Sequence, residues 1–117
     1  MEIKRITING REVEFVNQSR GTRTGFAHDT TVFIDGFERH EATCIYYNRT
    51  WERYTYQTVM RKAVIELRDR QTDYLKEQFK AENGYQKLTA KRQEEFEAYR
   101  NGNEQVQFYT AILKELE

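Results

Sequence analysis

The sequence contains one cysteine, Cys44, and no proline, and its 19 basic side chains are balanced by 19 acidic ones. A lone cysteine excludes an intramolecular disulfide, which favours a reducing compartment. The balanced charge excludes a strong overall bias toward nucleic acid and also excludes DNA mimicry by the whole chain. No stretch approaches the roughly 18 apolar residues of a membrane-spanning helix. The opening residues lack the apolar stretch of a signal peptide, so we expect a cytoplasmic protein without membrane contact.

Aromatic side chains are abundant, making up 14% of the residues, with 8 tyrosines and 7 phenylalanines. Such side chains supply a core or a contact surface at low entropic cost, and disordered chains are poor in them. A length of 117 residues fits one domain that can bury a core without disulfides. We therefore predict a single domain over 1–117, with a β-hairpin part at 1–48 and a helical part at 49–117.

The first local signal is an Asn-Gly pair at 9–10 between two segments that alternate with period two. Asn-Gly accepts the positive φ values of a type I′ turn, so the pattern predicts a β-hairpin. Pairing outward from the turn places Ile6 opposite Val13, with apolar neighbours on that face. It places Arg5 opposite Glu14 on the other face.

A second hairpin is predicted over 26–47, around an Asp-Gly turn at 35–36. Regular alternation on both sides of this turn places His28 and Cys44 on opposite faces of the hairpin. We expect the tip of the hairpin to be exposed and the open end, which carries Ile45, to be buried.

From about Thr50 the apolar period changes to 3.6, which predicts a long helix that stops at Asn-Gly 83–84. Asn48 or Thr50 is the expected N-cap. About 33 helical residues would extend about 50 Å, whereas a compact domain of this size has a radius of gyration of about 13–14 Å. The helix must therefore protrude, pair with later helices, or break near 71–73, where the apolar stripe thins.

Two shorter helices are predicted at 88–100 and 103–116, with Thr89 and Asn103 as N-caps. The second of these has an apolar face, whereas the first is very polar. The simplest architecture is an α+β fold in which helices pack on a four-stranded antiparallel sheet formed by the two hairpins.

The second hairpin carries atom types that could bind zinc, chiefly His28, His40 and Cys44. Their spacing is no zinc signature, and His40 and Cys44 lie roughly 13 Å apart along one strand. A structural zinc site would need a bulge, a shifted register or a ligand from elsewhere. Ordinary polar strand positions are the favoured interpretation, so no cofactor is predicted.

No pattern in the sequence indicates catalysis. Cys44 with His28 or His40 is the only Cys–His pairing, and neither a glycine-rich turn nor a helix N-terminus lies nearby to form an oxyanion hole. The glutamates at 94–97 fit a solvated helix. We therefore predict a non-enzymatic protein.

Three exposed features are the predicted contacts with a protein partner: the polar segment 17–25, interpreted as a mobile loop, the tip of the second hairpin, and the long helix. Their contact side chains are Arg20, Arg23, Asp35, Phe37, Arg39, Arg61 and Arg68. The alternative is a nucleic-acid-binding or regulatory module that uses the basic side of the long helix. Its contact side chains are Arg49, Arg53, Arg61, Lys62 and Arg68.

Five aromatic residues fall within 45–57, at the junction of the second hairpin and the long helix. They form either a small core that joins sheet to helix or a binding patch. The part of this segment that runs Tyr46-Tyr47-Asn48-Arg49-Thr50-Trp51-Glu52-Arg53-Tyr54-Thr55-Tyr56-Gln57 resembles a run in small proteins of phages and plasmids of Gram-positive bacteria. The resemblance covers about residues 40–70.

Proteins of this kind include anti-CRISPR proteins, which inhibit a type II CRISPR effector nuclease by protein–protein contact. The resemblance implies that this chain is such a phage inhibitor, with an effector–guide complex as its partner in the host bacterial cytosol. It transfers no functional residue, because these inhibitors share no common motif. Many of them imitate DNA with a strongly acidic face, and this neutral chain departs from that pattern. It would instead lock or occlude a domain of its target.

Overall fold

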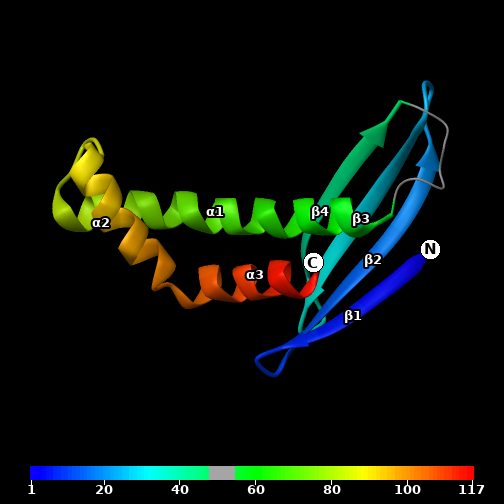
Figure 1. Cartoon of the computed structure of the whole chain (residues 1–117), viewed down its shortest axis with the longest axis horizontal. Coiled ribbons are helices and arrows are strands. Elements are labelled where there is room, and N and C mark those ends of the chain that lie inside the picture. The colour runs from blue at the N-terminus through cyan, green and yellow to red at the C-terminus, as the bar shows by residue number, and fades with distance from the viewer. Residues whose placement is uncertain (48–54) are drawn as a thin grey trace.

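The computed structural model describes residues 1–47 and 55–117, in which four strands are followed by three helices (Figure 1). The strands are β1 (Glu2–Ile8), β2 (Arg11–Gly21), β3 (Phe26–Ile34) and β4 (Phe37–Tyr46). The helices are α1 (Gln57–Asn83), α2 (Ala90–Asn101) and α3 (Glu104–Glu115). The strands form one antiparallel sheet in the order β1-β2-β3-β4. The predicted α+β fold, two hairpins followed by one long and two shorter helices, is confirmed.

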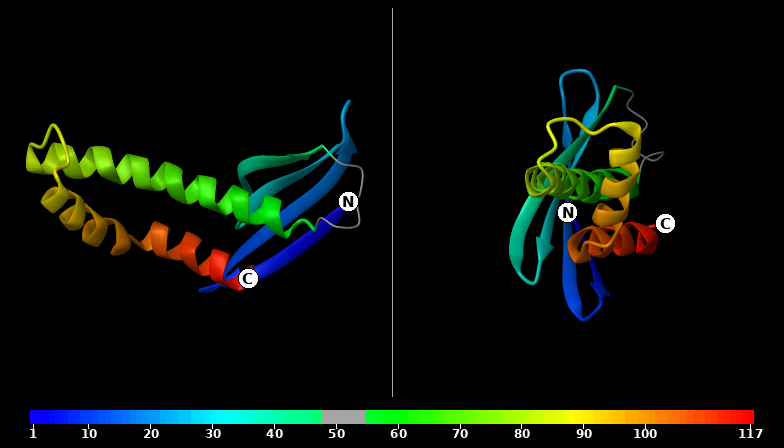
Figure 2. Two further views of the ribbon diagram at one scale, coloured as in Figure 1. Left: turned by 45° about the horizontal axis from the view of Figure 1, so that its top comes forward. Right: turned by 90° about the vertical axis from the view of Figure 1, so that its left-hand side faces the viewer.

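The molecule is elongated, because α1 crosses one face of the sheet and continues beyond it as an arm (Figure 1). α2 lies at the far end of the arm, and α3 returns beside α1 toward the sheet (Figure 2). The extents are 50 × 35 × 22 Å and the radius of gyration is 17.1 Å, above the roughly 13–14 Å of a compact domain. The long helix thus both protrudes and pairs with the later helices.

α1 is continuous through 71–73, which excludes the alternative of a break there. The Thr72 hydroxyl donates to the Arg68 carbonyl (2.9 Å) and accepts from Arg100 Nε of α2 (2.9 Å), so this polar residue is satisfied inside the helix. Beyond it, Leu75 and Phe79 are buried against the end of the arm. Contacts with α2 therefore stabilise the half of the helix in which the apolar stripe thins.

The first hairpin has the predicted register, with Ile6 opposite Val13 and Arg5 opposite Glu14. Arg5 Nε and Glu14 Oε2 lie 2.7 Å apart on the face away from the helices. The second strand, however, continues well past the predicted loop, through 17–21. Asn17 is fully buried, and its amide accepts from the Thr30 hydroxyl at 2.6 Å. The prediction of a mobile loop over 17–25 is therefore wrong for 17–21, because pairing with β3 and this hydrogen bond hold the segment in the sheet.

The second hairpin contains a β-bulge that changes the predicted faces. Val32 pairs with His40 and Phe33 pairs with Glu38, which leaves Arg39 as the extra residue. Past the bulge every side chain of β4 exchanges faces, so Cys44 lies directly opposite His28 and Ala42 is buried. The prediction that His28 and Cys44 face apart is therefore wrong.

The same exchange of faces explains the open end of this hairpin. Ile45 points away from the helices and is 53% exposed, which contradicts its predicted burial. Phe26 at the same end is fully buried. Phe37 at the tip is 68% exposed, as expected for the tip.

The predicted ends of the helices are largely confirmed. α1 stops at Gly84 in the left-handed conformation (φ 67°), and Thr89 and Asn103 accept hydrogen bonds as N-caps of α2 and α3. α1 begins at Gln57, later than predicted, and the Tyr56 hydroxyl just before it shares a hydrogen bond with Ser19 of β2 (2.7 Å). The predicted caps, Asn48 and Thr50, lie outside the described residues. Over 1–47 and 55–117, no helix combines the length and apolar character needed to cross a membrane.

Two hydrophobic clusters lie along α1. The larger fills the space between the sheet and the near halves of α1 and α3, with Phe15, Val32, Val64 and Ile112 fully buried. The smaller lies at the far end of the arm and consists of Leu75, Phe79, Phe96 and Val106. α1 is therefore the element that connects two separately packed regions.

Candidate binding surface

The predicted contact residues on the segment after Asn17 differ in their availability. Arg20 Nε lies 2.8 Å from Asp29 Oδ2 on the adjacent strand, so its charge is already paired within the sheet. Arg23 is exposed in the short turn that remains between β2 and β3. In that turn Gly25 approaches β4 so closely that a Cβ would meet the Tyr46 carbonyl. Only Arg23 of this pair is free for a partner.

At the tip of the second hairpin, Asp35 has a structural role. Its carboxylate accepts the Glu12 N–H (3.0 Å) and pairs with Arg11 Nε (3.0 Å). The hydrogen bond from Glu12 and the one from Arg11 hold the pKa of Asp35 below its ordinary value. Phe37 and Arg39 are exposed beside it. The tip thus offers one apolar and one cationic side chain, at the end of the sheet opposite to Arg23.

The basic residues of α1 point in different directions. Lys62 Nζ donates to the Thr43 carbonyl of β4 (2.6 Å), whereas Arg61 Nη1 donates to the Leu113 carbonyl of α3 (3.1 Å). Arg68 lies two turns beyond Arg61 on the side of α3. The structure therefore does not bring Lys62 onto one surface with Arg61 and Arg68. The other two residues of the predicted nucleic-acid set, Arg49 and Arg53, lie outside the described residues.

A groove between α1 and α3 gathers cations over an apolar floor. It has a volume of about 390 Å³, with Arg61, Ile65 and Arg68 on one side and Thr110, Leu113 and Lys114 on the other. Glu117 at its end is the one carboxylate among the described residues that line it. Within the described part of the chain, neither arginine nor Lys114 forms an ion pair.

Arg68 is the most unusual of these cations. Its side chain is half-buried, and its Nε has no contact with solvent and no hydrogen-bond partner in the ranges that the structure describes. A buried donor without an acceptor costs about 1–3 kcal/mol. An oxygen acceptor in the groove could recover that free energy only if the Arg68 side chain turned its Nε outward.

A second depression adjoins the groove on the outer side of α3. It has a volume of about 380 Å³, shares Thr110 and Lys114 with the groove, and has Val106 and Ala111 in its lining. The two depressions form a continuous area, which we call the α3 surface and define by its central side chains. They are Arg61, Ile65, Arg68, Thr110, Ala111 and Lys114.

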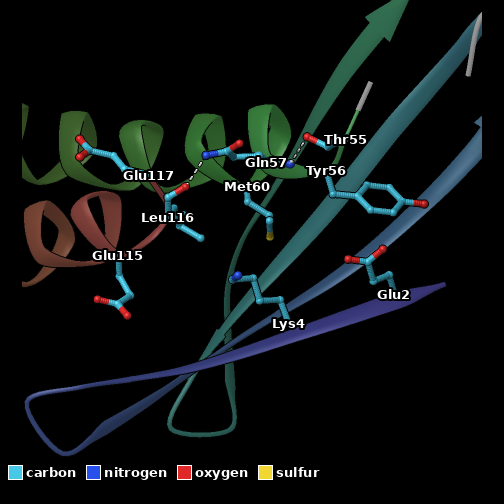
Figure 3. A pocket seen from close by; sticks show the side chains of 9 residues that line it. All are labelled: Glu2, Lys4, Thr55, Tyr56, Gln57, Met60, Glu115, Leu116 and Glu117. Atoms are coloured by element: carbon cyan, nitrogen blue, oxygen red, sulfur yellow. Dashed lines mark hydrogen bonds between the residues drawn. The ribbon is translucent and has the colours of Figure 1, made fainter. Parts of the chain in front are cut away.

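A different pocket of about 350 Å³ lies where β1 meets the start of α1 and the end of α3 (Figure 3). Gln57 donates to the Leu116 carbonyl across it, which joins the two helix ends. Figure 3 shows Glu2 and Lys4 on β1 beneath this junction. Its described lining includes no histidine or cysteine.

The candidate zinc ligands are distributed among other contacts. His40 contacts Glu66 Oε1 through Nε2 (3.2 Å) and Arg70 through Nδ1 (3.0 Å). His28 and Cys44 face each other across β3 and β4. Among residues 1–47 and 55–117, no group of three or more His, Cys, Asp or Glu side chains could hold a metal ion.

His28 lies in an aromatic cluster beneath the start of α1. Its ring centroid is 4.6 Å from that of Tyr56, 5.2 Å from Phe26 and 5.3 Å from Tyr46, and the residue is 4% exposed. Burial lowers the pKa of His28 below its ordinary value of 6.5, against the smaller opposing effects of the Thr55 carbonyl and the Asp29 charge. The folded protein therefore favours the neutral imidazole.

We expect the chain to lose stability as the pH falls below about 6.5, because the unfolded state then binds a proton that folded His28 resists. Each pH unit below that value removes up to about 1.4 kcal/mol of unfolding free energy until the folded pKa is reached. Urea unfolding at pH 7.5 and pH 5 measures the loss. A His28→Phe variant keeps an aromatic ring and should remove most of the difference. Equal stability of the wild type at both pH values would contradict this role.

Comparison with known proteins adds no family to this geometry: no family model, curated protein or solved structure matches the chain. Function is therefore inferred from the chemistry of the described surface. Sequence reasoning found Arg61 and Arg68, and their spacing of seven residues already indicates a shared helix face. It missed Lys114 and Ile65, which join them only through the packing of α3 against α1.

Proposed function

We propose that this chain is a non-enzymatic protein that acts by binding a protein partner through the α3 surface. The supporting observation is a group of cations over the apolar residues Ile65 and Leu113. Among residues 1–47 and 55–117 these cations have no carboxylate partner, and a buried donor of Arg68 is left unpaired. Arginine beside partly exposed apolar side chains is typical of the residues that dominate protein interfaces. Arg20 and Asp35 are less suited to partner binding, because each already forms an ion pair with a neighbouring strand residue.

In its specific form the proposal is an anti-CRISPR function: a phage or mobile-element protein that inhibits a type II CRISPR effector nuclease in the bacterial cytosol. The resemblance of the segment at 46–57 supports it, and 48–54 of that segment lie outside the described residues. The neutral charge argues for an inhibitor that occludes or locks a domain over one that imitates DNA. The elongated shape suits such a role, because it presents a long helical side to a partner.

We expect the chain to inhibit target cleavage by a purified type II effector–guide complex and to co-elute with that complex in size-exclusion chromatography. Lys114→Glu reverses one charge of the α3 surface and should weaken inhibition about tenfold or more. Lys91→Glu makes the same change at an exposed position of α2 outside that surface and should leave inhibition unchanged.

Unchanged cleavage together with separate elution would contradict the anti-CRISPR function. The alternative function, nucleic-acid binding through Arg49, Arg53, Arg61, Lys62 and Arg68, predicts a different result. It requires an electrophoretic shift of single- or double-stranded DNA or RNA that falls steeply with salt. The hydrogen bond of Lys62 to β4 makes this alternative the less supported of the two.

A further inference from the structure

We infer that the α3 surface binds an acidic, amphipathic helical segment of its protein partner. This inference rests on the proposal that the chain acts by binding a protein, and it adds the chemistry of that partner. It does not depend on which protein supplies the segment.

The spacing of the cations matches a helix. Arg61 and Arg68 are seven residues apart, which places them on one side of α1 about 10.5 Å from each other. A partner helix with acidic side chains at i and i+7 has the same spacing. Lys114 lies across the groove on α3, so it can meet a carboxylate on the opposite edge of the same partner helix.

The strip between the cations is apolar. Ile65 is on the same side of α1, four residues after Arg61 and three before Arg68. Ile65 is only partly buried against the larger core, and Leu113 of α3 lines the same groove. Ala111 lies in the adjoining depression on the outer side of α3, where its small side chain lets another backbone approach closely. Apolar side chains of the partner at i+3 or i+4 would cover this strip, which is the pattern of a helix laid in a groove.

Arg68 and Lys114 are the expected anchors. Arg61 already donates to the Leu113 carbonyl and so has fewer donors left for a ligand. Among the described residues, the Arg68 guanidinium is engaged in no hydrogen bond or ion pair, so it can turn to a carboxylate, with which arginine makes short bidentate hydrogen bonds. Glu117 at one end of the groove disfavours a carboxylate there and thus favours one register of the partner.

A nucleic acid fits this surface less well than an acidic peptide. Nucleic-acid affinity depends on many phosphate contacts, and this area offers three cations around an apolar strip. Single strands also require aromatic side chains for base stacking, and none of the described residues that line the two depressions is aromatic.

The test is a selection of random displayed peptides of about 16 residues, or about four helical turns, on the immobilised full chain. We expect the enriched peptides to be acidic, with apolar residues spaced by three or four. Synthetic copies should lose affinity about tenfold or more for Arg68→Met and for Lys114→Glu. They should bind Lys91→Glu as tightly as the wild type.

Two features keep the outcomes distinct. Arg68→Met retains the aliphatic stem, and Lys114 is exposed, so circular dichroism should show both variants folded. Enrichment of basic or neutral peptides, no enrichment, or tighter binding of a single-stranded oligonucleotide at the same residues would each overturn the inference. The selection contains no effector nuclease, so failure of the anti-CRISPR function and failure of this inference are read from separate experiments.

Discussion

Replacing Phe15 with alanine is expected to destabilise the chain by about 3–5 kcal/mol. Phe15 lies on β2, a central strand of the sheet, and its side chain is fully buried in the larger cluster beneath α1 and α3. Removing the ring deletes its buried apolar area and leaves a cavity that close-packed neighbours fill only in part. Urea unfolding followed by far-ultraviolet circular dichroism measures the change.

Phe37→Ala is the matched control, since it deletes the same ring from the same sheet. Phe37 is 68% exposed at the tip of the second hairpin, so its removal should change the unfolding free energy by less than about 0.5 kcal/mol. Similar losses for both variants would contradict the assignment of β2 to the centre of the core.

Replacing Phe79 with alanine should loosen the end of the arm without unfolding the sheet. Phe79 is the centre of the smaller cluster, with its ring centroid 5.6 Å from that of Phe96, 5.4 Å from Tyr99 and 5.9 Å from Tyr85. Truncating a buried phenylalanine to alanine costs about 3–5 kcal/mol, which exceeds the stability that so small a cluster can contribute. We expect amides of α2 and of the last turns of α1 to exchange with solvent about a hundredfold faster or more.

Hydrogen exchange resolved by element provides the measurement, and Tyr74→Ala provides the control. Tyr74 is on the same helix but is 58% exposed, so its removal should leave the exchange rates nearly unchanged. If amides of β2 and β3 accelerate in Phe79→Ala as much as those of α2, the two clusters form a single cooperative unit and the expectation fails.

Local chemistry explains which parts of the fold were predictable. Asn9 and Asp35 adopt positive φ (51° and 52°), each followed by a glycine, as the two hairpin turns require. Gly84 ends α1 in the left-handed conformation, and the Thr89 and Asn103 side chains accept backbone N–H groups at the starts of α2 and α3. Each of them acts on backbone groups that a helix end leaves unpaired. These features depend on neighbours within a few residues, which a single sequence contains.

The mistaken expectations have a non-local cause in common. The bulge at Arg39 is invisible in the alternation of β4, and one extra residue is enough to exchange the face of every position after it. Asn17 has the composition of a loop residue but is buried, because Thr30 and Met60 on other elements satisfy its amide. At Thr72, where the sequence left a break open as one alternative, the helix continues and Arg100 of α2 donates to the Thr72 hydroxyl.

In the candidate surface, too, a local feature was predictable from the sequence and a feature set by tertiary packing was not. The shared face of Arg61 and Arg68 follows from helical spacing, and the sequence predicted both as contacts. Two other contacts follow only from the packing of α1 against β4 and α3. Lys62 donates to the Thr43 carbonyl of β4, and Lys114 lines the same groove as the two arginines. A property of one helix was predictable, whereas a property of two packed helices was not.

The bulge at Arg39 also affects whether copies of the molecule can associate by strand pairing. β4 ends the sheet on one side, and a flat outer strand would offer its free N–H and C=O groups to another chain. The bulge disrupts the regular edge of β4 and adds the charge of Arg39 there, while β1, the opposite edge strand, carries Glu2, Lys4 and Arg5. Both edge strands therefore disfavour edge-to-edge pairing of copies into fibrils. Deleting Arg39 would remove the bulge from β4 and with it one of these two protections.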